Sequence, residues 1–225
     1  MSVTTSEGAT AADYRLVAFD FDGTLADTFP WFCTNLNDVA ARYRFRRVEA
    51  GETERLRGLG ARAILKDLGI PVWKVPLIAR HMRALATREA GQVRLFPGVP
   101  EMLAELDAAG IALAVVSSNS EANVRRALRG AAGLIRHFDC GAALFGKARH
   151  LRAVARTAGF DPAEMLAVGD EIRDAEAAAR AGCAFAAVAW GYNSPEALAG
   201  VAPAYLFAEP SDVVRALAGP SRRAY

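Results

Sequence analysis

The feature of this sequence that most constrains its fold is the repeated alternation of short apolar runs with segments of helical periodicity. Apolar runs that predict strands lie at residues 14–19, 111–116, 140–144, 165–168, 185–189 and 205–207. Helical patterns lie at residues 100–109, 121–128, 148–158, 175–181 and 212–217. Strands that alternate with helices of this length form right-handed βαβ units, whose parallel sheet is covered on both faces. The sequence therefore predicts an α/β fold, a Rossmann-like parallel sheet with helices on both faces.

One long stretch interrupts the alternation. Residues 29–94 contain no convincing strand. Their helical patterns lie at residues 31–43, 53–68 and 74–89, and a Gly-Leu-Gly sequence breaks the second pattern at residues 58–60. A purely helical stretch between the first and second predicted strands indicates a small helical domain inserted into the sheet domain.

The chain is therefore predicted to have three parts. Residues 1–13 are small and polar, and we expect them to be flexible. Residues 14–28 and 95–225 form the core, and residues 29–94 form an inserted helical cap. The segments that join cap and core, around residues 28–30 and 93–97, are the expected hinges.

Composition excludes several classes of protein. Hydrophobic residues make up 52% of the chain and charged residues 23%, which is typical of a globular protein rather than a disordered one. The chain has 27 basic and 25 acidic residues, so its net charge of +2 gives no reason to expect a nucleic acid or a membrane as the partner. No apolar run approaches the roughly 18 residues of a membrane-spanning helix, and the first residues lack the apolar region of a secretory signal. We expect a cytoplasmic protein.

The residues that follow the predicted strands form a chemically coherent set. In open parallel sheets, ligands bind outside the carboxyl ends of the strands. The polar side chains expected at those ends are Asp20, Asp22, Ser117, Ser118, Lys147, Asp170 and Asp174. Carboxylates that lie together repel one another unless a cation neutralises them, and oxygen ligands favour a hard ion such as Mg2+. A lysine and hydroxyl groups beside such an ion suit a tetrahedral oxyanion, so the set predicts phosphoryl transfer.

Lys147 is the most informative cation of this set. Of the 27 basic residues only Lys66, Lys74 and Lys147 are lysines, and all others are arginines. A compact ammonium group fits a crowded site of metal and phosphate better than a planar guanidinium group. The alternative is a solvated lysine at a helix start, a position where the helix dipole disfavours a cation.

Four motifs occur in order along the chain. They are DFDGTLADT at residues 20–28, VVSSN at 115–119, FGK at 145–147 and VGDEIRDAEAAARAG at 168–182. In these motifs the chain resembles the haloacid dehalogenase superfamily, and within it the branch of the phosphoglycolate phosphatases. The resemblance extends over residues 14–217. It implies the core fold of that superfamily, and it identifies the helical insertion with the cap of that branch.

The resemblance implies a role for each residue at the strand ends. Asp20 is expected to be the nucleophile that accepts the phosphoryl group, and Asp22 the general acid and base. Ser117 would bind phosphate through its hydroxyl group, together with the backbone amide of Ser118. Lys147 would neutralise the phosphoryl oxygens and the nucleophile.

The resemblance also implies a Mg2+ site. Asp170 is expected to bind the ion directly, together with the carboxylate of Asp20 and the backbone carbonyl of Asp22. Asp174 would hold water bound to the metal. A helix-capping role for Asp174 is an alternative that can coexist with this one. Glu171 would contact metal-bound water or lie on the surface.

The function predicted from these residues is a Mg2+-dependent phosphatase that hydrolyses a small phosphorylated metabolite through an aspartyl-phosphate. A sugar phosphomutase of the same superfamily is the nearest alternative, and a non-catalytic protein that binds a phosphorylated ligand is the alternative from another class. Dehalogenation is disfavoured because it does not need the acid and base Asp22. Phosphonate cleavage would require a cap lysine such as Lys66, and Arg62 is a candidate cap contact to substrate. The physiological substrate and the oligomeric state stay open.

Overall fold

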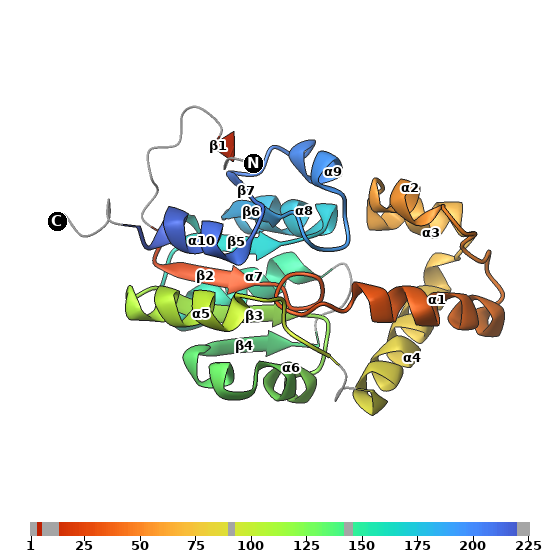
Figure 1. Cartoon of the computed structure of the whole chain (residues 1–225), viewed down its shortest axis with the longest axis horizontal. Helices are drawn as coiled ribbons and strands as arrows, with labels where there is room; N and C mark the ends of the chain where they lie inside the picture. The colour runs from red at the N-terminus through yellow and green to blue at the C-terminus, as the bar shows by residue number, and fades with distance from the viewer. Residues whose placement is uncertain (1–3, 6–13, 90–92, 142–145, 220–225) are drawn as a thin grey trace.

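The computed structural model describes residues 4–5, 14–89, 93–141 and 146–219 (Figure 1). Within these residues the strands form one sheet in the order β1-β7-β6-β5-β2-β3-β4. The parallel strands are β2 (Leu16–Phe19), β3 (Ala112–Ser117), β4 (His137–Cys140), β5 (Met165–Gly169), β6 (Ala184–Val188) and β7 (Tyr205–Phe207). The predicted α/β fold with a parallel sheet is confirmed.

The central strand β2 shows why these strands are apolar at every position. All four of its residues are buried. Val17 and Phe19 belong to one hydrophobic cluster, and Leu16 and Ala18 belong to another. Because successive side chains of a strand point to opposite faces, the two clusters lie on the two sides of the sheet. A sheet covered on both sides has no face on which polar residues would be solvated.

Helices cover both sides of the sheet. Those of the core are α5 (Val99–Ala108), α6 (Glu121–Leu128), α7 (Lys147–Ala158), α8 (Ile172–Ala181), α9 (Pro195–Ala199) and α10 (Pro210–Leu217). Residues of α5 and α10 pack with Phe19, whereas residues of α7 and α8 pack with Leu16. α6 begins where the Ser120 side chain accepts a hydrogen bond from the backbone N–H of Asn123, and α8 ends at Gly182, which has a φ of +84°.

A helical segment lies between β2 and α5, beyond the carboxyl ends of the strands (Figure 1). It comprises α1 (Phe29–Tyr43), α2 (Thr53–Arg57), α3 (Ala61–Asp67), a short 3₁₀ helix η1 (Val72–Lys74) and α4 (Val75–Arg88). We call these helices the cap. The two connections to the core run side by side, because Asp27 N donates to Arg94 O at 2.9 Å and Phe96 N donates to Leu25 O at 3.0 Å.

The predicted third strand is misplaced. The apolar run at residues 140–144 predicts a strand there, but β4 spans His137–Cys140 and Gly141 follows with a φ of +80°. Residues 142–144 lie outside the described part of the chain. β4 pairs with β3 alone among the described strands, and all four of its residues are half-buried. An edge strand of this kind needs no apolar run, so hydrophobicity did not reveal it.

Two residues of the N-terminal segment take part in the sheet. Thr4–Thr5 forms the short strand β1, which pairs antiparallel with Tyr205 and Leu206 of β7. The outer edge of β7 offers backbone groups for such pairing. Residues 1–3 and 6–13 lie outside the described part of the chain. Among the described helices, none combines the length and apolar character required to cross a bilayer.

Candidate active site

Three neighbouring strands bring the predicted site residues to one edge of the sheet. β2 lies between β3 and β5, and Phe19 of β2 is opposite Val115 of β3 and Val168 of β5. The chain positions just beyond these partners are occupied by Asp20, Ser117 and Asp170. Because the strands are parallel and in this register, their polar ends converge at the edge that faces the cap.

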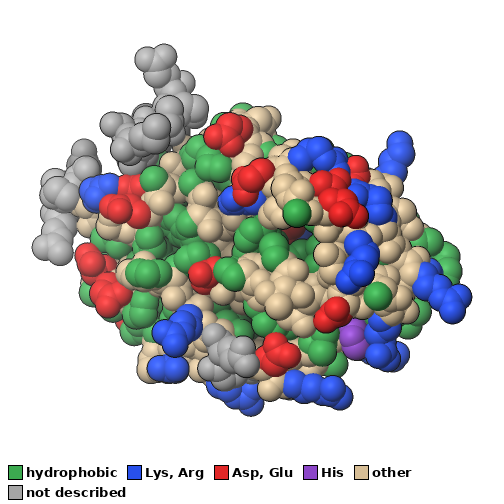
Figure 2. Space-filling view, turned by 45° about the vertical axis from the view of Figure 1, so that its right-hand side comes forward, with side chains coloured by type: hydrophobic (Ala, Val, Ile, Leu, Met, Phe, Trp, Pro, Cys, Tyr) green, Lys and Arg blue, Asp and Glu red, His purple; other side chains and the backbone are tan. Residues whose placement is uncertain are grey.

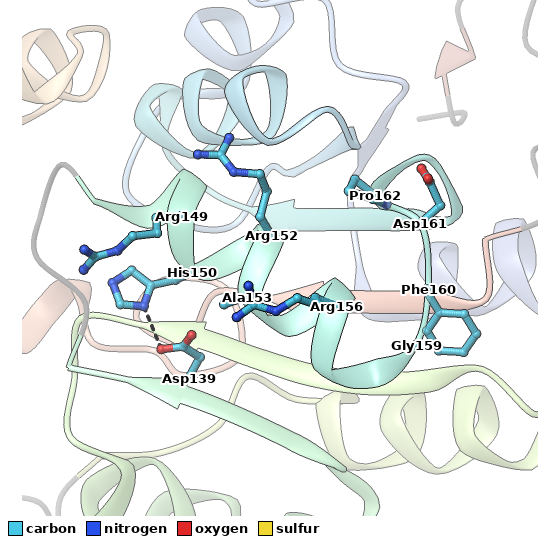
Figure 3. Close-up of a pocket in the computed structure, with 10 residues that line it drawn as sticks. All are labelled: Asp139, Arg149, His150, Arg152, Ala153, Arg156, Gly159, Phe160, Asp161 and Pro162. Atoms are coloured by element: carbon cyan, nitrogen blue, oxygen red, sulfur yellow. Dashed lines mark hydrogen bonds and ion pairs between the residues drawn. The ribbon is translucent and has the colours of Figure 1, made fainter.

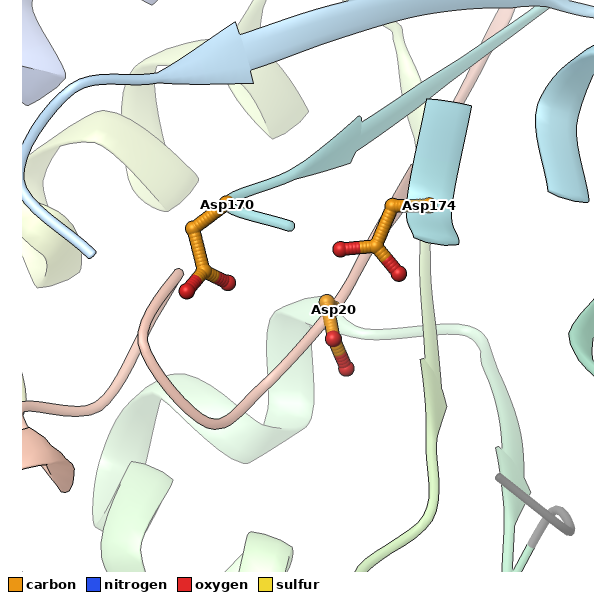
Figure 4. Close-up of side chains that lie close together, drawn as sticks. All are labelled: Asp20, Asp170 and Asp174. Atoms are coloured by element: carbon orange, nitrogen blue, oxygen red, sulfur yellow. The ribbon is translucent and has the colours of Figure 1, made fainter. Parts of the chain in front are cut away.

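Asp20, Asp170 and Asp174 form a compact carboxylate cluster. Each of the three side chains offers a carboxylate oxygen, and these oxygens lie within 4.8 Å of one another. The three residues come from the end of β2, the end of β5 and the first turn of α8 (Figure 4). All three residues are buried. Buried carboxylates at this separation are neutralised either by protons or by a compensating cation.

Lys147 supplies part of this compensation. Its Nζ lies 2.8 Å from Asp20 Oδ2 and 2.8 Å from Asp174 Oδ1. The Lys147 side chain is only 13% exposed, so it is not a solvated cation. Burial opposes the charge, but the carboxylates of Asp174 and Asp20 outweigh it and raise the pKa of Lys147. The ammonium group therefore stays charged between the two carboxylates.

Asp174 takes part in helix capping, as one of the two predicted roles requires, and it also contacts Lys147. Its predicted role in holding metal-bound water stays a prediction. Its Oδ2 accepts a hydrogen bond of 3.1 Å from the backbone N–H of Glu171 in a capping box at the start of α8. Its Oδ1 receives the hydrogen bond from Lys147. The capping box at the start of α8 thus fixes the orientation of a carboxylate that also belongs to the cluster.

The carboxylate of Asp170 is held on both oxygens. Thr24 Oγ1 donates to Asp170 Oδ1 at 2.7 Å, and the backbone N–H of Tyr192 donates to Asp170 Oδ2 at 2.8 Å. A Cβ atom on Gly23 or on Gly191 would overlap the Asp170 side chain. The close approach of these two backbone segments is therefore possible only because both residues are glycines.

Asp22 lies beside the cluster and has the electrostatics of a proton donor and acceptor. Burial and the negative charge of Asp20 raise the pKa of Asp22 to about 6, although hydrogen bonds from Asn119 and Thr28 oppose the shift. Asn119 Nδ2 donates to Asp22 Oδ2 at 3.2 Å. A carboxyl group with a pKa near 6 can both give and accept a proton close to neutral pH.

The donor set fits a small, hard divalent cation. The cluster offers only carboxylate oxygens, which are the ligands that Mg2+ prefers. Burial first, and then the charges of neighbouring carboxylates, raise the pKa of Asp170 well above its ordinary value. A divalent cation between Asp20 and Asp170 would remove the repulsion that causes part of this shift. The residues present therefore suit the predicted Mg2+ site, and the ion itself stays a prediction.

Two of the predicted phosphate-binding residues, Ser117 and Ser118, lie at the end of β3, on the side of β2 opposite β5. Ser117 is the last residue of β3, and its buried hydroxyl group accepts a hydrogen bond of 3.0 Å from the backbone N–H of Asn119. Ser118 follows in the turn and is half-buried. The structure thus brings Ser117, Ser118 and Lys147 to the same strand ends as Asp20. Their binding of phosphate stays a prediction.

Several polar residues of the site did not stand out in the sequence. Arg173 Nη2 lies 2.5 Å from Glu171 Oε1, and its charge lowers the pKa values of Asp20 and Asp22 against the effect of burial. Its position next to Asp174 within the fourth motif was the available signal. Glu171 is accordingly an ion-pair partner at the site rather than a surface residue. Tyr192 lies in a loop far from every motif, so no local pattern indicated it.

The cap candidates are not gathered at the carboxylates. Lys74 Nζ donates to Tyr43 O within the cap at 2.8 Å, and Lys66 is exposed. Arg62 is exposed and lines a cavity of about 200 Å³ together with Gly60 and Arg173. This cavity lies where α3 meets α8.

A larger hollow of about 1020 Å³ lies elsewhere on the core (Figure 3). It is lined by residues of α7, by the turn that follows α7 and by Asp139 of β4. Within it, His150 Nδ1 lies 2.7 Å from Asp139 Oδ1. The hollow is open, and its lining includes none of the three carboxylates of the cluster.

Comparisons with known proteins agree with the motifs and the fold. The family model of haloacid dehalogenase-like hydrolases matches residues 17–188. The phosphoglycolate phosphatase of Synechococcus elongatus is 31% identical over 205 residues, which cover 90% of this chain and 97% of that protein. The phosphoglycolate phosphatase of Mesorhizobium japonicum is 34% identical over 194 residues, which cover 79% of this chain and 84% of that protein.

A solved structure supports the fold. The crystal structure of a predicted phosphoglycolate phosphatase from Haemophilus somnus superposes with a TM-score of 0.69 at 24% identity, over 92% of this chain and 99% of that chain. The residues 17–188 that match the family model include all four motifs. The chain therefore belongs to the family of haloacid dehalogenase-like hydrolases and is similar to its phosphoglycolate phosphatases.

Proposed function

We propose that this hydrolase is a Mg2+-dependent phosphatase that acts on a small phosphorylated metabolite resembling phosphoglycolate. The observation that carries the proposal is the position of Lys147, which lies 2.8 Å from the carboxylates of both Asp20 and Asp174. A buried nucleophile beside a fixed cation suits a phosphoryl group, whose oxygens carry the charge that the cation neutralises. Relatives named phosphoglycolate phosphatases support the substrate class.

In the proposed reaction, Asp20 attacks the phosphorus atom and forms an aspartyl-phosphate. Asp22 gives its proton to the departing alcohol oxygen. The same carboxylate then accepts a proton from the water molecule that attacks the phosphorus, which releases inorganic phosphate and regenerates Asp20. A pKa of about 6 for Asp22 supports both of these proton transfers near neutral pH.

The remaining residues position charge around the phosphoryl group. Lys147 neutralises the phosphoryl oxygens, and the Ser117 hydroxyl with the Ser118 amide binds them. Asp20 and Asp170 hold the Mg2+ ion, with the backbone carbonyl of Asp22 as a further ligand. The bound ion supplies positive charge that stabilises the transition state. Asp174 orients Lys147 and holds water beside the ion.

The cap completes the proposed site. The two connecting segments, which are joined by hydrogen bonds between Asp27 and Arg94 and between Leu25 and Phe96, serve as its hinge. When the cap lies on the core it excludes bulk water from the aspartyl-phosphate, and its inner surface selects the leaving group. This assignment follows the predicted division into a core and a cap at residues 29–94.

A direct test is the hydrolysis of p-nitrophenyl phosphate with Mg2+ and with EDTA. We expect release of p-nitrophenol that requires Mg2+ and returns when the metal is restored. Activity that survives EDTA would contradict the metal assignment. Absence of Mg2+-dependent release at every pH would contradict the phosphatase and favour a non-catalytic binding protein.

A second assay separates the phosphatase from a mutase and names the substrate class. Phosphoglycolate is compared with a panel of small phosphate esters, including hexose phosphates, by the release of inorganic phosphate. We expect stoichiometric release, with the highest kcat/KM for a short anionic ester. A hexose phosphate whose phosphoryl group moves to another hydroxyl, in the presence of a bisphosphate activator, would instead identify a phosphomutase.

A further inference from the structure

Residues 190–194, between β6 and α9, form a loop that contacts both the carboxylate cluster and the cap. We call it the 190–194 loop. On the core side it holds Asp170, because Tyr192 N donates to Asp170 Oδ2 at 2.8 Å and Asn193 N donates to Asp170 O at 3.2 Å. Trp190 Nε1 donates to the backbone carbonyl of Thr24 at 3.0 Å. Thr24 is itself the donor to the other oxygen of Asp170.

On the cap side the same loop is held mainly by Arg57, the last residue of α2. Arg57 Nε donates to Tyr192 O at 3.1 Å, and its Nη2 donates to Gly191 O at 3.0 Å. In the opposite direction, Ser194 N of the loop donates a hydrogen bond to Arg57 O at 3.0 Å. The Tyr192 ring makes edge contacts with Phe29 at 5.0 Å between ring centroids. A single arginine therefore joins the cap to the two peptide groups next to the Asp170 hydrogen bond.

Asn193 is the second connection between the cap and the carboxylates. Its side chain is buried, and its Nδ2 donates to Arg57 O at 2.7 Å and to Leu59 O at 2.9 Å. Its Oδ1 accepts a hydrogen bond of 2.9 Å from the backbone N–H of Ile172, the first residue of α8. One amide group thus links the turn between α2 and α3 to the helix that carries Asp174.

The geometry leaves the loop little freedom at Asp170. Gly191 and Gly23 both approach the Asp170 side chain so closely that a Cβ atom on either would overlap it. Tyr192 Oη and Thr28 Oγ1, at the start of the cap, lie 3.1 Å apart. Because the loop and the Asp170 side chain are packed without free space, a displacement of the loop would change the hydrogen bond from Tyr192 N to Asp170 Oδ2.

We propose that the 190–194 loop transmits contact of the cap to Asp170, with Arg57 and Asn193 as positioning residues. When the cap lies on the core, these two side chains keep the Tyr192 N–H against Asp170 Oδ2 and so fix the orientation of the carboxylate. The proposal rests on the proposed function in one respect, which is that Asp170 binds the divalent cation. Because coupling is reciprocal, metal binding and the cap-on state favour each other.

The test measures binding of Mn2+ in the absence of substrate, by electron paramagnetic resonance. Mn2+ prefers the same oxygen ligands as Mg2+, and the measurement does not depend on catalysis. The variants are Arg57→Ala and a matched control, Arg55→Ala, on the same helix. Arg55 pairs with Asp67 at 3.0 Å and Glu52 at 3.1 Å, both within the cap. Asn193→Ala is the second test variant.

We expect Arg57→Ala and Asn193→Ala to weaken Mn2+ binding roughly fivefold, a typical size for a coupling through packed residues. Arg55→Ala should bind Mn2+ within about twofold of the unchanged protein, since it removes only interactions inside the cap. Circular dichroism and thermal unfolding verify that each variant is folded. If one test variant fails to fold, the other decides the outcome.

Two outcomes would overturn the proposal. If folded Arg57→Ala or Asn193→Ala binds Mn2+ as the unchanged protein does, the loop does not transmit cap contact to Asp170. If Arg55→Ala weakens binding as much as Arg57→Ala, the effect reflects general loss of cap charge. In both cases the phosphatase proposal stands. A protein that binds no Mn2+ at all would overturn this proposal together with the metal assignment, which distinguishes the two failures.

Discussion

Two clusters in this molecule each combine carboxylates with basic side chains, but the pKa values of their carboxyl groups shift in opposite directions. One is the carboxylate cluster at the sheet edge with Lys147. The other lies on the cap, where acidic and basic side chains gather on the surface (Figure 2). In the cap cluster Arg46 lies 2.7 Å from Glu52 and 2.5 Å from Asp67, and Arg55 lies 3.0 Å from Asp67.

The clusters shift their carboxyl groups in opposite directions. On the cap, hydrogen bonds from Arg46 and Arg55 lower the pKa values of Glu52 and Asp67 to about 2. At the sheet edge, burial outweighs every favourable contact and raises the pKa of Asp22 to about 6. The cap carboxylates accept hydrogen bonds from arginines, whereas Asp22 lies beside the negative charge of Asp20. The charges of the neighbouring side chains, together with burial, decide the direction in which the pKa of each carboxyl group shifts.

The largest expected effect comes from removing one carboxylate from each cluster. We expect Asp20→Asn to lower kcat for p-nitrophenyl phosphate by roughly 10⁴-fold or more, because the amide does not attack phosphorus. Asp67→Asn, the same change on the cap, should leave kcat within about threefold. Circular dichroism verifies folding of both. Comparable losses would contradict the distinction between the two clusters.

The cations provide the second comparison. Lys147→Ala removes a buried charge between two carboxylates, and we expect kcat/KM to fall about 10²- to 10³-fold, as for the loss of one group that stabilises the transition state. Arg55→Ala removes a half-exposed cation that forms ion pairs with Glu52 and Asp67 of the cap, and kcat/KM should change little. Steady-state kinetics at saturating Mg2+ measures both. A mild effect of Lys147→Ala on kcat/KM would show that the ion pairs of Lys147 do not contribute to catalysis.

The raised pKa of Asp22 predicts a dependence of stability on pH. A carboxyl group with a pKa of about 6 when folded and 3.8 when unfolded stabilises the fold at low pH, and this contribution is lost as pH rises between these values. The full effect is about 3 kcal/mol, and we expect about 2 kcal/mol for this half-buried side chain.

Asp22→Asn should therefore raise the free energy of unfolding at pH 8 and change it much less at pH 4. Urea unfolding in EDTA at the two pH values measures the difference, with the metal removed so that it does not stabilise the charged form. An equal gain in the free energy of unfolding at both pH values would show that the negative charge of Asp22 does not destabilise the fold.

The smallest effect is expected on the cap. Because the pKa of Asp67 is lowered, its charge stabilises the fold above pH 4, and the contribution disappears as pH falls through about 2. Asp67→Asn should lower Tm slightly at low salt, and the difference should vanish in about 1 M NaCl, where charges are screened beyond about 3 Å. Differential scanning calorimetry at two salt concentrations measures it. A difference that persists at high salt would indicate a buried rather than a solvated pair.

Much of the site could be predicted because strand ends are encoded locally. The apolar run before Asp20 and the one before Asp170 each predict a strand, and parallel strands bring their carboxyl ends to one edge. The same reasoning failed for β4, whose half-buried residues carry no apolar pattern. It also could not reveal Tyr192, which contacts Asp170 through a backbone N–H that every residue type except proline supplies.

The sequence by itself determined the α/β fold, the helical insertion and the polar residues that meet at the strand ends, because these depend on periodicity and on short motifs. Only the tertiary structure decided which charged side chains lie beside one another and which are buried. These contacts explain why the pKa of Asp22 is raised while the pKa of Asp67 is lowered. It also decided that Arg57, among so many arginines, reaches the loop beside Asp170. Burial and long-range hydrogen bonds arise from packing between distant segments, which no local pattern records.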